Sequence, residues 1–152
     1  MQSYQDPGGA FSIDYPKAWK VRRADNGYTV FYRDDPEEGT LFGIFPRLVL
    51  DGEATAAQII QVLLQDIRKR YPDFEVKDQK IESDSKGGEF AFVKARWTNG
   101  RNEAMTTVLV MHVERSGGGR TVLLLLNVQA PEVAFSALEP TFSHMFKSLQ
   151  AR

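Results

Sequence analysis

Alternating apolar and polar residues predict three strands in the first third of the chain. Residues 11–15 alternate as a half-buried strand does, and Pro16 ends this strand. Residues 28–32 are rich in β-branched and aromatic side chains, which favours a second strand, and residues 40–50 predict a third. Pro46 lies inside the third strand. Because proline cannot donate to the ladder of a sheet, it indicates either an edge strand or a bulge.

A helix follows, and both of its ends are marked in the sequence. Thr55 and Gln58 form a capping box, in which the threonine oxygen accepts a backbone N–H and the glutamine reaches back to the cap. Pro72 prevents the helix from continuing. Between these ends, one apolar stripe recurs at steps of three and four residues: Ala56, Ile60, Leu63, Ile67 and Tyr71.

Four further strands, separated by glycine-containing loops, are predicted in the middle of the chain. Short loops join antiparallel neighbours, and the Asn-Gly pair at 99–100 is the strongest hairpin signal. Residues 122–126 are all apolar, which predicts a central strand that is covered on both faces. The predicted strands are residues 74–81, 89–97, 104–114 and 121–128, and the loops are residues 85–88, 98–101 and 116–119.

A second apolar stripe predicts a helix at the end of the chain. Pro140 lies inside this segment, so it either kinks the helix or begins a second helical piece. Runs of strands with two separated helices predict an α+β fold, and no repeat or linker divides residues 1–152, which we expect to form one domain. The stripe consists of Phe135, Leu138, Phe142, Met145, Phe146 and Leu149.

Composition narrows the functional classes. The 152 residues include no cysteine, which excludes disulfide scaffolds and thiolate catalysis. A formal net charge of -1 gives no general attraction to nucleic acid. No apolar run approaches the roughly 18 residues that span a bilayer, and residues 1–10 do not have the pattern of a signal peptide. We therefore expect a soluble protein, cytoplasmic as the chain stands, or extracytoplasmic if an export signal or anchor has been removed.

Candidate catalytic and metal-binding residues are isolated from one another. His112 falls on a predicted strand and His144 on the last helix, and we interpret both as structural residues. The glycines of residues 117–120 precede a strand rather than a helix, which indicates a hairpin and not a phosphate loop. The acidic turn at residues 34–38 lacks the spacing of a calcium loop. We predict no catalytic centre, no cofactor and no metal site.

Three aromatic residues could line a ligand pocket. Tyr15 and Trp97 belong to predicted strands, and Trp19 follows the first strand. Burial in the core is the usual role of such side chains, so we favour core positions, with Trp19 closing one end of the fold.

The strand at residues 89–97 presents two different faces. Phe90, Phe92, Lys94 and Arg96 alternate with small and apolar residues and therefore share one face. This mixture indicates either a strand that leaves the core at its rim, which we prefer, or an exposed aromatic and basic patch for a partner or a second copy. These four residues, together with Trp19, are our candidates for a ligand or partner surface.

Two segments resemble the PsbP-like (Mog-type) domain family. Residues 11–19 resemble the opening strand of these domains and the Tyr-Pro and Trp that follow it, although Ala18 stands where glycine is usual. Residues 140–149 resemble their last helix, and the order of elements fits along nearly the whole chain. The resemblance implies an α/β/α sandwich, in which a central antiparallel sheet of about six to seven strands carries two main helices.

The resemblance also implies a class of function. Members of the family include an extrinsic subunit of photosystem II, a protein that binds the small GTPase Ran, and bacterial exported or lipid-anchored proteins. We therefore expect a bacterial, non-catalytic binding or assembly module with an unknown protein partner, and a homodimer is a further option. The alternative is a carrier that holds an apolar small molecule between sheet and helix. The third, less favoured, is an enzyme that uses a histidine. Analogy of fold does not choose among these roles.

Overall fold

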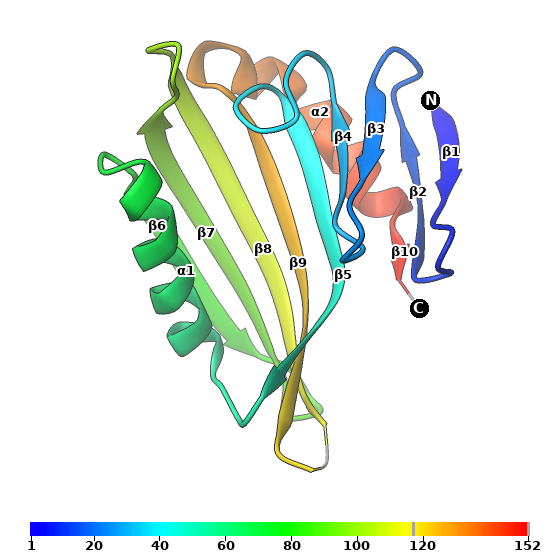
Figure 1. The fold of residues 1–152 in the computed structure, drawn as a ribbon, viewed down its shortest axis with the longest axis vertical. Helices are drawn as coiled ribbons and strands as arrows, with labels where there is room; N and C mark the ends of the chain where they lie inside the picture. Colours follow the sequence, from blue (N-terminus) through cyan, green and yellow to red (C-terminus); the bar gives the residue numbers. More distant parts are fainter. Residues whose placement is uncertain (117, 152) are drawn as a thin grey trace.

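A seven-stranded antiparallel sheet forms the centre of the protein (Figure 1). The computed structural model describes residues 1–116 and 118–151, which contain ten strands and two helices. In spatial order, the strands of the central sheet are β3 (Lys20–Arg23), β4 (Thr29–Tyr32), β5 (Leu41–Asp51), β9 (Arg120–Pro131), β8 (Ala104–Ser116), β7 (Glu89–Thr98) and β6 (Glu75–Ser83). Gly117, in the predicted loop between β8 and β9, lies outside the described residues.

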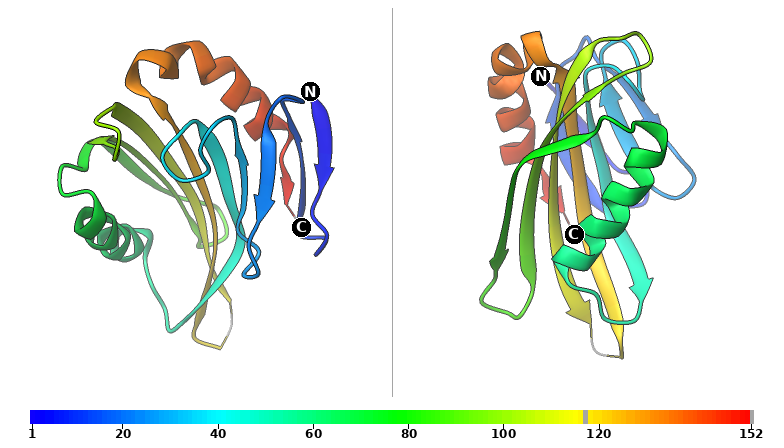
Figure 2. Two further views of the ribbon diagram at one scale, coloured as in Figure 1. Left: turned by 45° about the horizontal axis from the view of Figure 1, so that its top comes forward. Right: turned by 90° about the vertical axis from the view of Figure 1, so that its left-hand side faces the viewer.

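Two helices lie on opposite faces of this sheet (Figure 2). Helix α1 (Ala56–Arg70) covers one face and helix α2 (Glu132–Ser148) the other. The α2 side also carries a small sheet in the order β1 (Gln2–Gln5), β2 (Phe11–Tyr15), β10 (Gln150–Ala151). The predicted α+β fold, a central antiparallel sheet between two helices, is confirmed.

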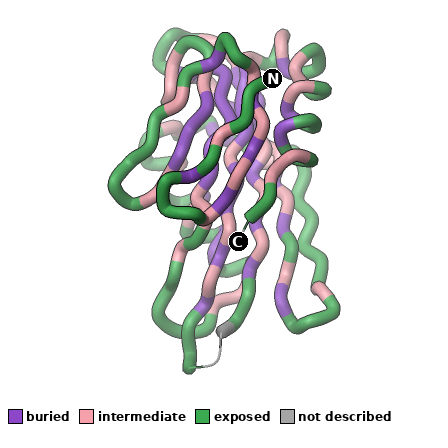
Figure 3. The backbone as a smooth tube through the Cα atoms, turned by 90° about the vertical axis from the view of Figure 1, so that its right-hand side faces the viewer, coloured by how far each residue is buried: buried purple, intermediate pink, exposed green. Residues whose placement is uncertain are grey.

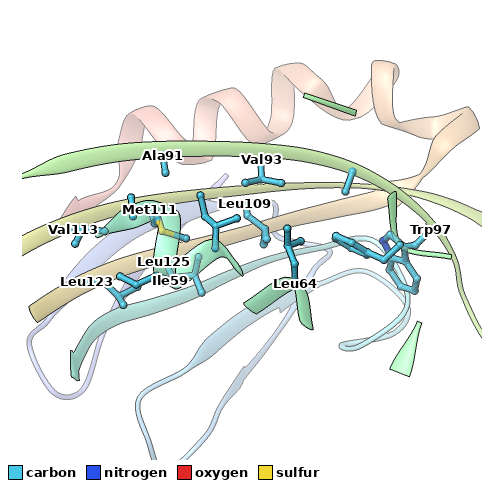
Figure 4. Packing of buried hydrophobic residues seen from close by; sticks show 14 of the residues in the cluster. Ile59, Leu64, Ala91, Val93, Trp97, Leu109, Met111, Val113, Leu123 and Leu125 are labelled. Carbon is cyan, nitrogen blue, oxygen red and sulfur yellow. The ribbon is translucent and has the colours of Figure 1, made fainter. Parts of the chain in front are cut away.

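Alternate residues of the long strands supply two separate cores. Side chains such as Val93, Met111 and Leu125 point away from α2 and pack with α1 (Figure 4). Their neighbours Leu126 and Val128 pack with α2. Successive side chains of a strand point to opposite faces, so one sheet provides both cores. Each fully buried side chain of this size stabilises the fold by roughly 1.5–3 kcal/mol.

Helix α1 begins with the predicted capping box. The backbone N–H of Gln58 donates to Thr55 Oγ1 at 3.2 Å, and the backbone N–H of Thr55 donates to Gln58 Oε1 at 2.9 Å. The helix ends at Arg70, with Tyr71 as its C-cap directly before Pro72. Local residues therefore set both ends of α1, as predicted.

Helix α2 differs because its first turn has no side-chain cap. Pro131 occupies its N-cap position without any side-chain hydrogen bond, and the helix continues through Pro140. Of the two alternatives for Pro140, a second helical piece is therefore wrong. Phe135 before the proline and Phe142 and Met145 after it are all buried in one core, which holds the helix together across the lost backbone hydrogen bond.

The pairing of β5 settles the two alternatives for Pro46. This strand pairs with β4 on one side and β9 on the other, and its register with β9 shifts between Phe45 and Leu48. Pro46 therefore lies in a bulge, and it lies just beyond Ile44, the last residue of β5 that pairs with β4. The first predicted strand, residues 11–15, forms as β2, but it belongs to the small sheet.

Exposure is greatest in the connecting loops (Figure 3) and along the edge strand β6. An edge strand presents unpaired backbone groups, and the charged side chains of β6, including Asp78, Lys80 and Glu82, oppose the addition of another strand. In the described part of the chain, no helix is long and apolar enough to span a membrane.

Candidate binding surfaces

Four of the five candidate surface residues lie on the face of β7 that is turned toward the α2 side of the sheet. Phe90 is 49% exposed and Arg96 is exposed, while Phe92 and Lys94 are half-buried. The opposite face of β7 is buried in the core beneath α1. The structure thus brings these four residues together along one strand, from an open end at Phe90 to the start of α2 at Arg96.

The basic residues of this face are engaged by α2. The Lys94 ammonium lies 5.8 Å from the centroid of the Phe135 ring, and Arg96 Nε lies 3.4 Å from Glu132 Oε2. They border a pocket of about 260 Å³ that also touches Ser136. Exposed ion pairs of this kind stabilise a fold by less than about 1 kcal/mol. Lys94 and Arg96 are therefore partly satisfied within the chain.

The other end of this face forms a partly exposed apolar surface beside the C-terminal end of α2. Phe90 stacks on the His112 ring at a centroid distance of 4.3 Å and an interplanar angle of 17°. Val110 of β8, Leu124 of β9 and Phe146 of α2, itself 51% exposed, line the same pocket of about 270 Å³. Phe90, Val110, His112, Leu124 and Phe146 are called the Phe90 surface below.

His112 holds the loop between β6 and β7 against this surface. Its Nε2 lies 3.0 Å from Asp84 Oδ2, and its Nδ1 lies 3.6 Å from Glu114 Oε1. Asp84 Oδ1 accepts the backbone N–H groups of Lys86 and Gly88. The hydrogen bond from His112, and then those two backbone N–H groups, hold the pKa of the Asp84 carboxyl below its ordinary value. Carboxylates face both ring nitrogens, which favours a structural role for His112.

His144 lies apart from His112 and has a different setting. It is half-exposed on α2, with Nε2 3.9 Å from Asp14 Oδ2. In the ranges that the structure describes, no group of three or more histidine and acidic side chains is placed to hold a metal ion.

The acidic turn is a clamp between distant elements. Asp35 accepts the backbone N–H groups of Glu37 and Glu38, which lower the pKa of its carboxyl. Glu38 Oε2 accepts the Tyr71 hydroxyl at 2.8 Å and the Gly100 N–H at 3.0 Å. The turn therefore ties the end of α1 to the hairpin between β7 and β8, a role that its composition did not reveal.

The three aromatic candidates occupy core positions. Trp19 is 7% exposed and meets Phe142 edge-on, with ring centroids 6.2 Å apart. Tyr15 is buried in the same core, and Trp97 is buried beneath α1, where it also lines the pocket at the C-terminal end of that helix. Trp19 is thus buried in the α2-side core, as we favoured, and does not line the hollow of the Phe90 surface.

The α1 face contains two further pockets. One, of about 270 Å³, is apolar and lies beside the N-terminal half of α1, where Val62 is 60% exposed. The other, of about 250 Å³, lies at the C-terminal end of α1 and is lined by polar residues that sequence reasoning missed. Thr107, Asn127 and Gln129 are in phase with the buried residues of β8 and β9, and polar residues in such a phase are the signal that could have revealed this pocket.

Comparison with known proteins places the fold. Three solved structures match almost the whole chain, among them PsbP (CyanoP) from the cyanobacterium Synechocystis, with a TM-score of 0.58, 13% identity and coverage of 99% of this chain and 92% of that one. LpqN of Mycobacterium tuberculosis has a TM-score of 0.58 and 17% identity, and the match covers 98% of this chain and 90% of that one. The Ran-binding protein Mog1p of Saccharomyces cerevisiae has a TM-score of 0.51 and 13% identity, and the match covers 99% of this chain and 94% of that one. The chain has the PsbP/Mog-like fold.

The resemblance seen at the two ends of the sequence is confirmed at the level of the fold. No protein-family model matches the sequence, and no curated protein is similar to it by sequence. At sequence identities of 13–17%, these proteins share the PsbP/Mog-like architecture with this chain. Functional residues therefore have to be argued from this chain itself.

Proposed function

We propose that this protein is a non-catalytic accessory module that binds a partner protein through the Phe90 surface. The observation that carries the proposal is the pair of half-exposed phenylalanines, Phe90 and Phe146, on either side of half-buried apolar strand residues around a hollow. Scattered apolar residues are normal on a protein surface, whereas a contiguous group around a hollow is typical of an interaction site. Aromatic residues are also enriched at interfaces.

The charges around the Phe90 surface indicate the chemistry of the partner. Glu82 lies opposite Phe90 on the edge strand β6, and Asp84 and Glu114 flank His112. One basic residue, Arg47, lines a neighbouring pocket that shares His112 and Leu124 with the Phe90 surface. The partner that fits this rim presents an apolar anchor for the hollow, with Lys or Arg beside it to meet the carboxylates.

The remaining candidates extend the contact. Phe92, Lys94 and Arg96 continue the same face of β7 toward α2, where Glu132 and Phe135 hold the two basic side chains. We assign the anchoring role to Phe90 and a flanking role to these three residues. Trp19 is left out because it is buried.

Two findings support an accessory role over a catalytic one. Asp84, which binds His112, also accepts two backbone N–H groups of its own loop, so this contact supports a role for His112 as a loop anchor. Among the structural neighbours, Mog1p is a Ran-binding protein, so this fold serves protein binding in that case.

The test compares substitutions at two exposed apolar positions. Phe90→Asp places a charge at the anchor, whereas Val133→Asp makes the matched change at a 96% exposed residue in the first turn of α2. Partners captured by photo-cross-linking at position 90 are purified and titrated by calorimetry. We expect Phe90→Asp to weaken binding about 30-fold, as for an interface hot spot, and Val133→Asp to change it less than twofold.

Salt dependence tests the charge argument in the same titration. Binding through basic partner residues weakens as salt screens the exposed carboxylates. A partner that binds wild type and Phe90→Asp equally well, or whose binding is indifferent to salt, would contradict the proposal. Melting temperatures of both variants show whether the fold is retained.

A second candidate function, the carrier of an apolar molecule, is favoured by the groove beside the N-terminal half of α1. Leu48, Leu63 and Leu123 line it, and Val62 leaves its edge exposed. A bound ligand raises the stability of the folded state. An unchanged melting temperature across a series of fatty acids and fatty alcohols would count against this candidate.

A further inference from the structure

We propose that the pocket at the C-terminal end of α1 binds a small uncharged compound that carries a planar ring and an amide-like polar group. The pocket, of about 250 Å³, lies on the α1 face of the sheet, away from the Phe90 surface. It is bordered by the last turn of α1, the acidic turn at residues 34–38, and β8 and β9. The inference is therefore independent of the protein-binding role.

The walls of this pocket suit a flat ring. Tyr71 and Trp97 lie side by side, with centroids 4.5 Å apart, and Leu41 and Ile67 add aliphatic surface. Aromatic side chains gain from contact with another ring as well as from the area they bury. Such walls, together with a volume below that of drug-sized pockets, indicate a single ring.

The inner side of the pocket is polar. The Trp97 indole N–H donates to Thr107 Oγ1 at 2.7 Å, and Gln129 donates to the backbone oxygens of Glu37 and Gly39. Asn127 differs from these residues, because its buried Oδ1 has no hydrogen-bond partner in the part of the chain that the structure describes. A buried polar atom left unpaired costs about 1–3 kcal/mol. A ligand amide can supply that hydrogen bond after a rotation of the Asn127 amide, whose terminal torsion is soft.

Tyr28 lies beside Asn127 in this pocket. The ring of Tyr28 stacks on Phe45 at 4.2 Å, and its hydroxyl lies over Gly43, where a Cβ would collide with it. A hydrogen bond with the Asn127 side chain opposes the rise that burial produces in the pKa of the Tyr28 hydroxyl. Gly43 thus provides the space that places a second polar group beside Asn127.

Charge in the pocket excludes an ionic ligand. Its charged lining residues, Glu37 and Arg70, form an exposed ion pair at 3.0 Å. Burial, and then the hydrogen bond to Glu38, raise the pKa of Tyr71 to about 12, and burial raises that of Tyr28, so both hydroxyls are neutral near pH 7. Because Glu37 and Arg70 already pair with each other, an ionic group would lose its hydration here without gaining a free counter-charge, and a pure hydrocarbon would leave Asn127 Oδ1 unpaired.

Three probes of similar shape test this specificity: benzamide, which is neutral and polar; benzoate, which is charged; and toluene, which is apolar. Each is titrated into the isotope-labelled protein and followed by amide chemical shifts. We expect benzamide to bind with a Kd on the order of 1 mM, since it has few atoms, and to shift residues 107, 127 and 129. Benzoate and toluene should bind at least about tenfold more weakly.

Variants assign the binding to this pocket. Asn127→Leu removes the amide and should weaken benzamide about three- to tenfold, whereas Gln79→Leu, the matched change on the exposed edge strand β6, should have no effect. Gly43→Ala leaves Asn127 in place but displaces the Tyr28 ring, and it should weaken benzamide at least as much. Melting temperatures identify any variant that does not fold.

Four outcomes would overturn the proposal. These are no binding of benzamide up to about 20 mM, equal binding of the three probes, shifts that map to another surface, and unchanged affinity in a folded Asn127→Leu variant. The Phe90→Asp variant should bind benzamide as wild type does, so failure here is distinguishable from failure of the protein-binding proposal.

Discussion

The two faces of the central sheet are closed to different extents, and the difference shows how the Phe90 surface arises. At the end of the sheet away from α2, Val113 and Leu123 are buried in the core beneath α1. Their sequence neighbours on the opposite face, His112 and Leu124, are only half-buried. The strands carry large side chains on both faces there, and α2 covers the other end of its face (Figure 2). The position of one helix, and not a change in the strands, creates the exposed surface.

The largest effect should distinguish covered from uncovered residues of β9. Leu126, which is 2% exposed, is a buried member of the core beneath α2, whereas Leu124 is only half-buried at the edge of that core. We expect Leu126→Ala to lower the free energy of unfolding by about 2–5 kcal/mol, and Leu124→Ala by about 1 kcal/mol or less. Urea denaturation measures both values. Equal losses would show that a second copy or a ligand covers Leu124 in solution.

The next effect concerns the cap that holds α1 in place. Thr55→Ala removes a side-chain oxygen that accepts the Gln58 N–H at 3.2 Å, and we expect a loss of about 1 kcal/mol in stability. Thr55→Ser keeps the oxygen and is the matched control, measured by the same denaturation. If Thr55→Ser lost as much stability as Thr55→Ala, the capping hydrogen bond would not be what stabilises the start of α1.

Stability should depend on pH through Tyr71, which lines the pocket at the C-terminal end of α1. Burial and the hydrogen bond to Glu38 raise its pKa to about 12 from 10.0. Its contribution to stability is therefore complete below pH 10 and is lost as pH rises toward 12. Wild type should lose stability across this window, and Tyr71→Phe should lose less. Identical pH profiles of the two proteins, measured by thermal melting, would show that the Tyr71 hydroxyl does not stabilise the fold through its hydrogen bond to Glu38.

The smallest effect should be local and should lie beside the Phe90 surface. Asp84 has a lowered pKa, so its hold on the loop is present near neutral pH and is lost as pH falls through that pKa. Asp84→Asn should speed hydrogen exchange at the Gly88 amide and make it insensitive to acidification, after correction for intrinsic rates. Ser85→Asn in the same loop is the control. Unchanged exchange at Gly88 would mean that His112 does not anchor this loop through Asp84.

Local patterns predicted the elements with strong periodicity. Alternation predicted β7 and β8, a continuous apolar run predicted β9, and the capping box predicted the start of α1, because these signals lie within a few residues of the structure they describe. The short strands β1, β3 and β10 were missed. β3, for example, consists of Lys-Val-Arg-Arg and is mostly exposed, so only its pairing with β4 makes it a strand.

The apolar run at residues 122–126 shows where the pattern was incomplete. We expected this strand to be covered on both faces. Leu125 and Leu126 are covered, but Val122 and Leu124 are half-buried, because α2 does not reach them. The residues alone are compatible with either result.

For the binding surfaces, alternation predicted correctly that Phe90, Phe92, Lys94 and Arg96 share a face. It did not predict Phe146, which comes from a helix 56 residues later in the chain and lines the same hollow. The pocket at the C-terminal end of α1 likewise brings together Tyr28, Trp97 and Asn127 from separate parts of the sequence.

The sequence by itself determined which side chains share a face, where α1 begins and ends, and which classes of chemistry are absent from the composition, because these depend on periodicity, local hydrogen bonds and residue type. Only the tertiary structure decided which faces are covered, and that Asn127 Oδ1, buried beside a pocket, has no hydrogen-bond partner among the described residues. Coverage depends on where distant elements dock, and docking is the sum of many weak apolar contacts that no short segment encodes.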